Sequence, residues 1–255
     1  MTSQGDFDSS PAPNKSNASV QNDTLSSSSY HIKVFTRRDL LSQPFLPDLR
    51  TVINASYRGH DIDPIGKVGD RVQHDNQVAD EIGTNGFTAV AFDLNEIVGT
   101  ASVKDWVSDA DGLVWKPDGY FATKSIDEAC SMQNIGSNTI DTISDPASCD
   151  GDFEIFMVAV KPGDKYRKKG IAERLVKACE QELQKRFTPN LAQLAETSYF
   201  RIMIKVVREI NGEYWLKKGF QIKGECCCPA FTWDLEKPFI LWAMKKHLFI
   251  DRAAQ

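Results

Sequence analysis

The sequence lacks any apolar run of about 18 or more residues, so no transmembrane helix is expected. Its beginning also lacks the basic start and apolar core of a secretory signal. Positive charge is not in excess, since the formal net charge is -5, which argues against a surface that wraps nucleic acid. We therefore expect a cytoplasmic protein with neither membrane nor nucleic acid as a partner.

Patterns typical of metal and nucleotide sites are missing as well. The 4 histidines are scattered and the 6 cysteines form no C-x-x-C pair, so we expect no metal. Cys226, Cys227 and Cys228 are consecutive, and adjacent cysteines rarely pair with each other, so we predict reduced thiols. No Gly-Lys-Ser/Thr loop is present, which disfavours a nucleotide hydrolase.

The 255 residues, 41% of them hydrophobic, suit one globular domain with a substantial core. Residues 1–29 are mostly Ser, Asn, Asp, Thr, Gln and Pro, which predicts a disordered N-terminal tail. Residues 30–255 are predicted to form a single domain. Within it, residues 104–152 show weak periodicity, and a loop of this length inside a compact domain is usually functional or disordered.

Hydrophobic periodicity predicts strands and helices in a defined order. Alternating or continuous apolar runs predict strands at 31–36, 86–92, 96–103, 153–160, 200–207, 220–223 and 239–243, the last one extending toward 251. Helical spacing predicts helices at 37–61, with a break near two prolines, and at 74–82, 169–187 and 211–218. This order predicts an α/β (α+β) fold, in which a mixed central sheet has helices on both faces.

The most informative stretch is 153–187, where a buried strand, a loop and an amphipathic helix follow one another. A helix N-terminus presents unpaired N–H groups and the positive end of its dipole, so it binds phosphate. Gly170 lets a phosphate approach the backbone, and Arg167, Lys168 and Lys169 add positive charge at the same place. Taken alone, these cations would be better explained as a solvated charge run or a weak nuclear signal.

Two motifs in the chain resemble those of the GCN5-related N-acetyltransferase (GNAT) superfamily. Val158-Ala159-Val160-x-Pro162, followed by Arg167-Lys168-Lys169-Gly170-Ile171-Ala172, resembles its acetyl-CoA motif, Arg/Gln-x-x-Gly-x-Gly/Ala after a strand ending in Val-x-Pro. Trp215-Leu-Lys-Lys-Gly-Phe220 resembles its second signature, usually written Tyr-x-x-x-Gly-Phe. The resemblance covers roughly residues 31–245. It implies a mostly antiparallel sheet with a splay between the fourth and fifth strands.

The resemblance also implies an acetyl-CoA-dependent N-acetyltransferase without a metal. The residues that it places at the cofactor are Val158, Ala159, Val160, Arg167, Lys168, Lys169, Gly170, Ile171, Ala172, Asn211 and Trp215. The pyrophosphate is expected on the backbone amides of 168–172, and the pantetheine arm along Val158 and Val160. The N–H of Val158 is expected to polarise the thioester carbonyl. For Asn211, capping of the following helix is an alternative.

Two residues are candidates for catalysis. Glu154 is the candidate general base, because some members of the family have a glutamate near this point and a carboxylate in an apolar strand suits base work near neutral pH. Its alternatives are a solvated position at the strand's start and a pair with a lysine. Trp215 replaces the family's tyrosine, and its indole is too weak an acid to protonate the thiolate. Tyr214 is therefore the candidate proton donor, with a packing role or protonation by solvent as alternatives.

The acceptor is expected between residues 44–61 and the insertion at 104–152. The insertion is acidic, so a lid formed by it would attract an amine such as a small cationic one, and a solvated surface loop is the alternative. Trp106 and Trp115 are candidate acceptor contacts. We therefore predict acetyl transfer to the primary amine of a small molecule by a monomer or homodimer. The alternatives are a protein or peptide N-acetyltransferase and a non-catalytic acyl-CoA-binding module.

Overall fold

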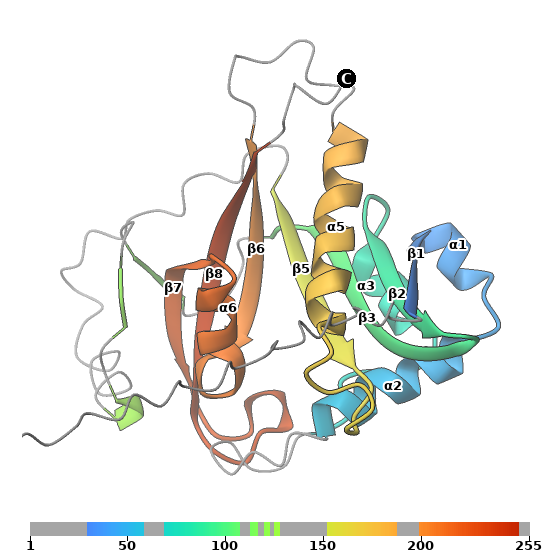
Figure 1. The fold of residues 1–255 in the computed structure, drawn as a ribbon. Helices are drawn as coiled ribbons and strands as arrows, with labels where there is room; N and C mark the ends of the chain where they lie inside the picture. The colour runs from blue at the N-terminus through green and yellow to red at the C-terminus, as the bar shows by residue number, and fades with distance from the viewer. Residues whose placement is uncertain are drawn as a thin grey trace, which may run out of the picture.

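The computed structural model describes residues 30–58, 69–107, 113–116, 120–122, 125–127, 152–187 and 199–249. Eight strands form one sheet in the order β1-β2-β3-β5-β6-β8-β7-β4 (Figure 1). Within the described chain, β5 and β6 pair in parallel and all other neighbours pair antiparallel. The predicted mixed, mostly antiparallel sheet is confirmed. The predicted disordered tail at 1–29 and most of the insertion lie outside the described residues.

The first part of the fold follows the predicted order of elements. It comprises β1 (Tyr30–Thr36), α1 (Arg37–Leu41), α2 (Leu46–Arg58), α3 (Gln77–Ile82), β2 (Phe87–Asp93) and β3 (Glu96–Asp105). The predicted helix break is confirmed, because Pro44 lies between α1 and α2. Pro47 is the second residue of α2. Proline is tolerated in this first turn because an N–H there would have no intrahelical acceptor.

The second part departs from the prediction at β7 and before α6. It comprises β4 (Val114–Trp115), β5 (Phe153–Val160), α5 (Ile171–Phe187), β6 (Tyr199–Val207), η2 (Arg208–Gly212, a π-helix), α6 (Glu213–Lys217), β7 (Gln221–Cys228), η3 (Thr232–Asp234, a 3-10 helix) and β8 (Phe239–Phe249). β7 runs longer than predicted and contains the three consecutive cysteines. Cys227 is disulfide-bonded, whereas Cys179, Cys226 and Cys228 are free thiols, so the prediction of reduced thiols throughout is wrong.

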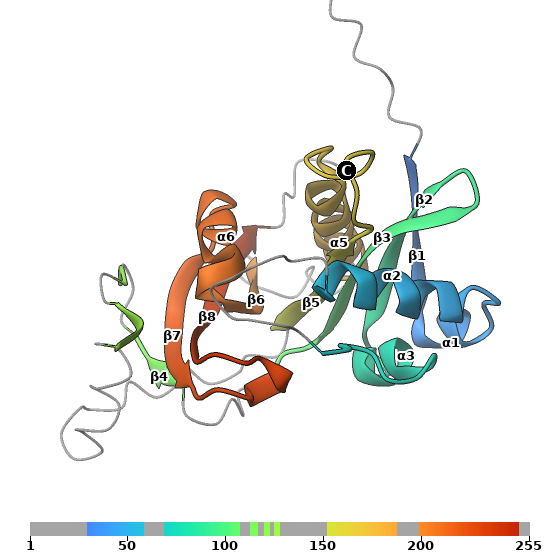
Figure 2. The same cartoon turned by 90° about the horizontal axis from the view of Figure 1, so that it is seen from below.

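Helices cover both faces of the sheet, as predicted. Figure 2 shows α5 and α6 on one side and α1, α2 and α3 on the other. On the α5 side, Leu175, Cys179 and Leu183 pack into one core cluster with sheet residues such as Ile155. On the α2 side, a second core cluster includes Ile53. The sheet is therefore the middle layer, and each side of a central strand faces a different core.

Within the described ranges, no helix is long and apolar enough to cross a membrane. The same ranges contain no group of three or more His, Cys, Asp or Glu side chains that would hold a metal ion. The cytoplasmic location stays a prediction.

Truncating Leu175 tests whether α5 is held to the sheet by burial of its apolar face. Leu175 is 0% exposed, so we expect Leu175→Ala to lower the free energy of unfolding by about 2–5 kcal/mol. Lys177→Ala, at an exposed position of the same helix, should change it by less than about 0.5 kcal/mol. Urea denaturation measures both. Equal losses in the two variants would contradict this account.

Candidate active site

β5 contains a β-bulge at Met157 that the sequence did not predict. Ser102 of β3 pairs with Phe156, and Thr100 pairs with Ala159, so two β5 residues stand opposite one β3 residue. Met157 has a φ of 49°, in the left-handed region that a non-glycine residue rarely adopts. Such a bulge interrupts the ladder and turns the following backbone groups away from their strand partner.

The bulge also changes the face of the sheet to which the β5 side chains after it point. Ile155 lies in the α5-side core, and regular alternation would send Met157 to the same side. Met157 lies instead in the α2-side core, together with Ala159. Val158 packs against the α5-side core. Glu154 and Phe156, which precede the bulge, therefore face the α2 side.

β5 and β6 pair over a short distance and then diverge. Their register contains Phe153↔Ile202 and Glu154↔Met203 and ends there. Figure 1 shows the two strands separating beyond this point. The predicted splay is confirmed. Beyond it the N–H of Val160 donates to Ser56 Oγ of α2 at 3.3 Å, a contact for which the sequence carries no signal.

The loop between β5 and α5 is fixed to the β2–β3 turn. Tyr166 Oη donates to Glu96 Oε2 at 2.7 Å, and Lys161 forms an ion pair with the same carboxylate. Lys165 Nζ lies 2.7 Å from Asp93 Oδ2. These contacts use two of the loop's five cations, and they hold the loop against the end of the β2–β3 hairpin.

The remaining cations of the loop stand unpaired at the start of α5. Arg167, Lys168 and Lys169 are exposed and form no ion pair with any residue that the structure describes. They precede Gly170, whose φ of +72° favours glycine and whose Cβ position has no protein atom within 4 Å. The cofactor residues predicted in the loop are therefore brought together on an accessible surface.

The N-terminus of α5 presents backbone donors beside these cations. Helical hydrogen bonding begins with Arg174 N–H donating to Gly170 O at 3.0 Å. The N–H groups of Ile171, Ala172 and Glu173 come before this bond and belong to the donors that a helix start leaves without an intrahelical partner. Together with the unpaired cations, they form an arrangement that suits an anionic phosphate group.

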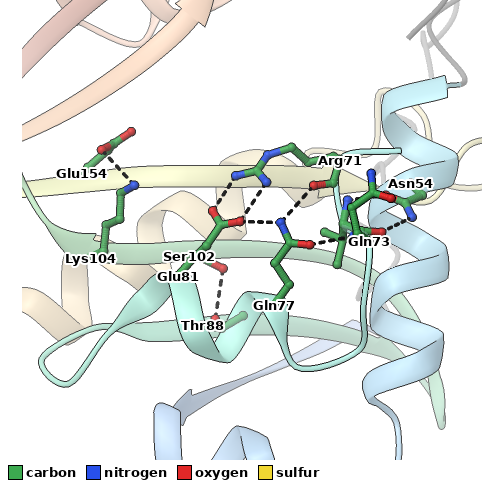
Figure 3. Close-up of polar contacts among 10 residues, drawn as sticks. Asn54, Arg71, Gln73, Gln77, Glu81, Thr88, Ser102, Lys104 and Glu154 are labelled. Atoms are coloured by element: carbon green, nitrogen blue, oxygen red, sulfur yellow. Dashed lines mark hydrogen bonds and ion pairs between the residues drawn. The ribbon is translucent and has the colours of Figure 1, made fainter. Parts of the chain in front are cut away.

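Glu154 is buried and lies beside a lysine. It is 5% exposed, so the alternative of a solvated strand start is wrong. Its Oε2 lies 3.5 Å from Lys104 Nζ on the neighbouring strand β3, which confirms the alternative of a lysine partner (Figure 3). Lys104 Nζ also lies 4.7 Å from the centre of the Phe156 ring. An ion pair of this length leaves the carboxylate able to accept a further hydrogen bond.

A chain of alternating charges extends from Glu154 to the segment around α3. Arg71 forms two hydrogen bonds with Glu81, at 2.9 and 2.6 Å, and Gln77 Nε2 donates to Glu81 at 2.7 Å (Figure 3). Burial alone would raise the pKa of Glu81, but the hydrogen bonds from Arg71 and Gln77 hold that pKa below its usual value. Lys104 interacts electrostatically with Glu81, and Arg71 with Glu154.

The second signature lies on the α5 side of the sheet. Trp215 is 4% exposed and packs at 5.2 Å between ring centres against Phe220, which makes it a core residue. Tyr214 is half-buried, with Lys218 Nζ 5.6 Å from the centre of its ring. Burial is the main cause that raises the pKa of Tyr214, so its hydroxyl stays protonated at neutral pH.

Asn211 does not cap the helix that follows it. It lies inside the π-helical turn η2, and the cap residue of α6 is Gly212, which makes no side-chain capping bond. The capping interpretation is therefore wrong. Asn211 Oδ1 is buried without a hydrogen-bond partner in the described residues. An orphaned amide oxygen of this kind suits contact with a ligand, and π-turns often occur at functional sites.

Of the two tryptophans predicted at the acceptor, the structure describes the side chain of Trp106. It is 6% exposed and lies under the ammonium group of Lys205, with 4.8 Å between Lys205 Nζ and the ring centre. It therefore has little surface for a direct contact with an acceptor. The side chain of Trp115 lies outside the described part of the chain.

No protein-family model and no curated protein matches this chain. Its fold is similar to that of a GNAT-family acetyltransferase from Streptococcus pneumoniae, with a TM-score of 0.49, 14% identity and coverage of 86% of this chain and 99% of that chain. For the ribosomal-protein-S18-alanine N-acetyltransferase from Escherichia coli, the TM-score is 0.48 and the identity is 12%. The match covers 89% of this chain and 98% of that chain. For the aminoglycoside 6'-N-acetyltransferase from Enterococcus faecium, the TM-score is 0.45 and the identity is 14%. The match covers 86% of this chain and 97% of that chain. Likenesses of this size assign neither an activity nor an acceptor to this chain.

The Lys104–Glu154 pair should contribute to stability in a way that a double-mutant cycle detects. Lys104→Met leaves the buried Glu154 carboxylate without its nearest cation, so we expect it to lower the free energy of unfolding by about 1–3 kcal/mol, a range that allows for the part of Lys104 that is solvated. In the Glu154→Gln background the same change should cost about 1 kcal/mol less. Urea denaturation of all four proteins measures this coupling. Additive effects would show that the pair contributes nothing.

Proposed function

We propose that this chain is an acetyl-CoA-dependent N-acetyltransferase that acetylates a primary amine by direct attack in a ternary complex. The observation that carries the proposal is the bulge at Met157, which follows the end of the β5–β6 pairing at Glu154 and precedes the loop into α5. There, backbone groups of Val158 and Val160 face away from regular strand pairing, and an extended arm that carries amide groups can pair with them. The N-terminus of α5 then takes the pyrophosphate.

The residues around the splay fit such a cofactor, which supplies the acetyl thioester. Arg167, Lys168 and Lys169 offer charge that no described carboxylate neutralises. Asn211 offers a buried amide oxygen without a partner. Ser56 accepts the N–H of Val160 and would exchange this bond for one with the cofactor. We also assign the backbone of Ala159, Ile171 and Ala172 to the cofactor site, whereas Trp215 acts by packing behind it.

We propose that Glu154 removes a proton from the acceptor's ammonium group. Its burial and its place three residues before the bulge at Met157 support this role. The nitrogen then attacks the acetyl carbonyl carbon, which an N–H of the bulged strand polarises, and the carbon–sulfur bond breaks. The departing thiolate takes a proton from Tyr214, our candidate donor, or from solvent. Lys104 balances the charge of Glu154 while the base is ionised.

A small-molecule amine is the proposed acceptor, handled by one domain that spans 30–255 as a monomer or homodimer. A non-catalytic acyl-CoA-binding module is the second candidate, because Trp215 stands where the family's tyrosine is expected. The module predicts binding of acetyl-CoA without release of CoA on any panel of amines. Release of free CoA across amines, polyamines and peptides distinguishes these candidates from each other and from a peptide N-acetyltransferase.

Replacing Gly170 tests the cofactor assignment. We expect Gly170→Val to weaken acetyl-CoA binding at least about tenfold, because its side chain would occupy the space where the phosphate is proposed to approach the backbone. Gly83→Val is the matched control, since Gly83 has a similar φ of +66° and also has no protein atom near its Cβ position. Calorimetry measures both affinities. Retained binding in Gly170→Val would exclude this site.

Replacing Glu154 tests the base. We expect Glu154→Gln to lower kcat by about 10²–10⁴-fold near neutral pH, and by less at high pH, where the amine loses its proton unaided. Affinity for acetyl-CoA should stay unchanged. Glu213→Gln, at an exposed position of α6, serves as the control. A pH–rate profile of Glu154→Gln that superimposes on that of the wild type would remove Glu154 from the mechanism.

A further inference from the structure

Lys205 of β6 lies on the same face of the sheet as Glu154. Met203 is the β6 partner of Glu154, and Lys205 follows two residues later, so its side chain leaves the strand on the same side. Pairing between β5 and β6 ends at Met203, which places Lys205 just past the point where the strands diverge. The acceptor's side of the splay therefore has Glu154 on one strand and Lys205 on the other.

The ammonium group of Lys205 is held in place by an aromatic ring. Lys205 is half-buried, and its Nζ lies 4.8 Å from the centre of the buried Trp106 ring. It forms no ion pair with any residue in the described ranges. Partial burial removes hydration from an ammonium group, which costs free energy. The contact with the aromatic ring offsets a part of this cost. A bound anionic group would offset more.

Among the described charged side chains near Glu154, cations outnumber carboxylates. Lys104 pairs with Glu154 from β3, Arg71 acts on it electrostatically, and Lys205 lies on the same face of the sheet, two residues past the β6 partner of Glu154. Against these three cations stand Glu154 itself and Glu81, and Arg71 already binds Glu81 through two hydrogen bonds. These described side chains together would repel a simple ammonium acceptor. An amine that also carries an anionic group would not be repelled.

We propose that Lys205, positioned by Trp106, binds a carboxylate on the amine acceptor. This inference rests on the proposed acetyl transfer and names its substrate class: amines that carry a carboxylate a few bonds away, as amino acids do. Lys205 lies two residues, about 6–7 Å, along β6 from Met203, and neighbouring strands lie about 4.8 Å apart, so the Cα positions of Glu154 and Lys205 are separated by about 8 Å or more. Their two side chains and a small amino acid between them can bridge such a separation. Polyamines and other acceptors with only positive charge are disfavoured.

The test uses acceptors in matched pairs, each an amino acid and its amide, assayed by release of free CoA. We expect the wild type to use at least one amino acid with a kcat/KM about tenfold or more above that of its amide. Lys205→Met should remove this preference by lowering kcat/KM for the acid alone. Lys205→Arg should retain the preference, and Lys205→Glu should reverse it. Trp106→Phe should weaken the preference in part.

Controls separate a recognition role from a structural one. Lys185→Met, at an exposed position in the last turn of α5, should leave both rates unchanged. Thermal unfolding midpoints show whether each variant is folded. If the wild type uses acid and amide equally, or if folded Lys205→Met loses the same factor on both, the proposal is overturned.

A binding experiment makes failure of this inference distinguishable from failure of the proposed function. Calorimetry with acetyl-CoA comes first, and absence of binding would overturn both proposals. If the cofactor binds but no amine is acetylated, the affinity of N-acetylated amino acids and of their amides is compared in the presence of CoA. Tighter binding of the acids that is lost in Lys205→Met supports the carboxylate site without turnover. Equal affinities overturn it.

Discussion

The change of hydrogen-bond partner in the middle of β5 is the constraint on which the rest of the site depends. Up to Glu154 the strand pairs with both β3 and β6, whereas beyond Glu154 it leaves β6 and keeps β3 through the bulge. Backbone groups inside a protein need partners, so the freed groups of β5 must bond to something else. Ser56 takes one of them. The proposed cofactor arm, the loop and the start of α5 all follow from the same departure.

The sequence predicted the main strands and helices well, because each of them has its own local pattern of apolar residues. The apolar run at 153–160 and the amphipathic pattern of α5 each correspond to one observed element. The bulge was not predictable, since the left-handed φ of Met157 arises from its register against β3 and not from a glycine. The three cysteines lie beyond the strand predicted at 220–223, yet β7 continues through them because β8 supplies its partner.

The sequence predicted the part of the candidate site that one continuous segment of backbone forms. It did not predict the contacts between side chains that lie far apart in the chain. Gly170 and its cations form one continuous segment, so a motif describes them. The contacts among Lys104, Glu81 and Arg71 join separate elements of the chain. These contacts form only through packing of the α3 region against the sheet, so no local pattern describes them. Trp106 was predicted as a contact for the acceptor. Its burial makes it a support for Lys205 instead.

The short parallel pairing of β5 with β6 also divides the sheet mechanically. β1, β2, β3 and β5 form one antiparallel half, and β6, β8, β7 and β4 form the other. At the shared end, Arg201 Nε donates to Asp152 Oδ1 at 2.8 Å, and the Phe153 and Phe200 rings pack edge to face. The halves are thus fastened at one end and separate at the other. Small rotations about the fastened end would widen or narrow the splay without breaking either half.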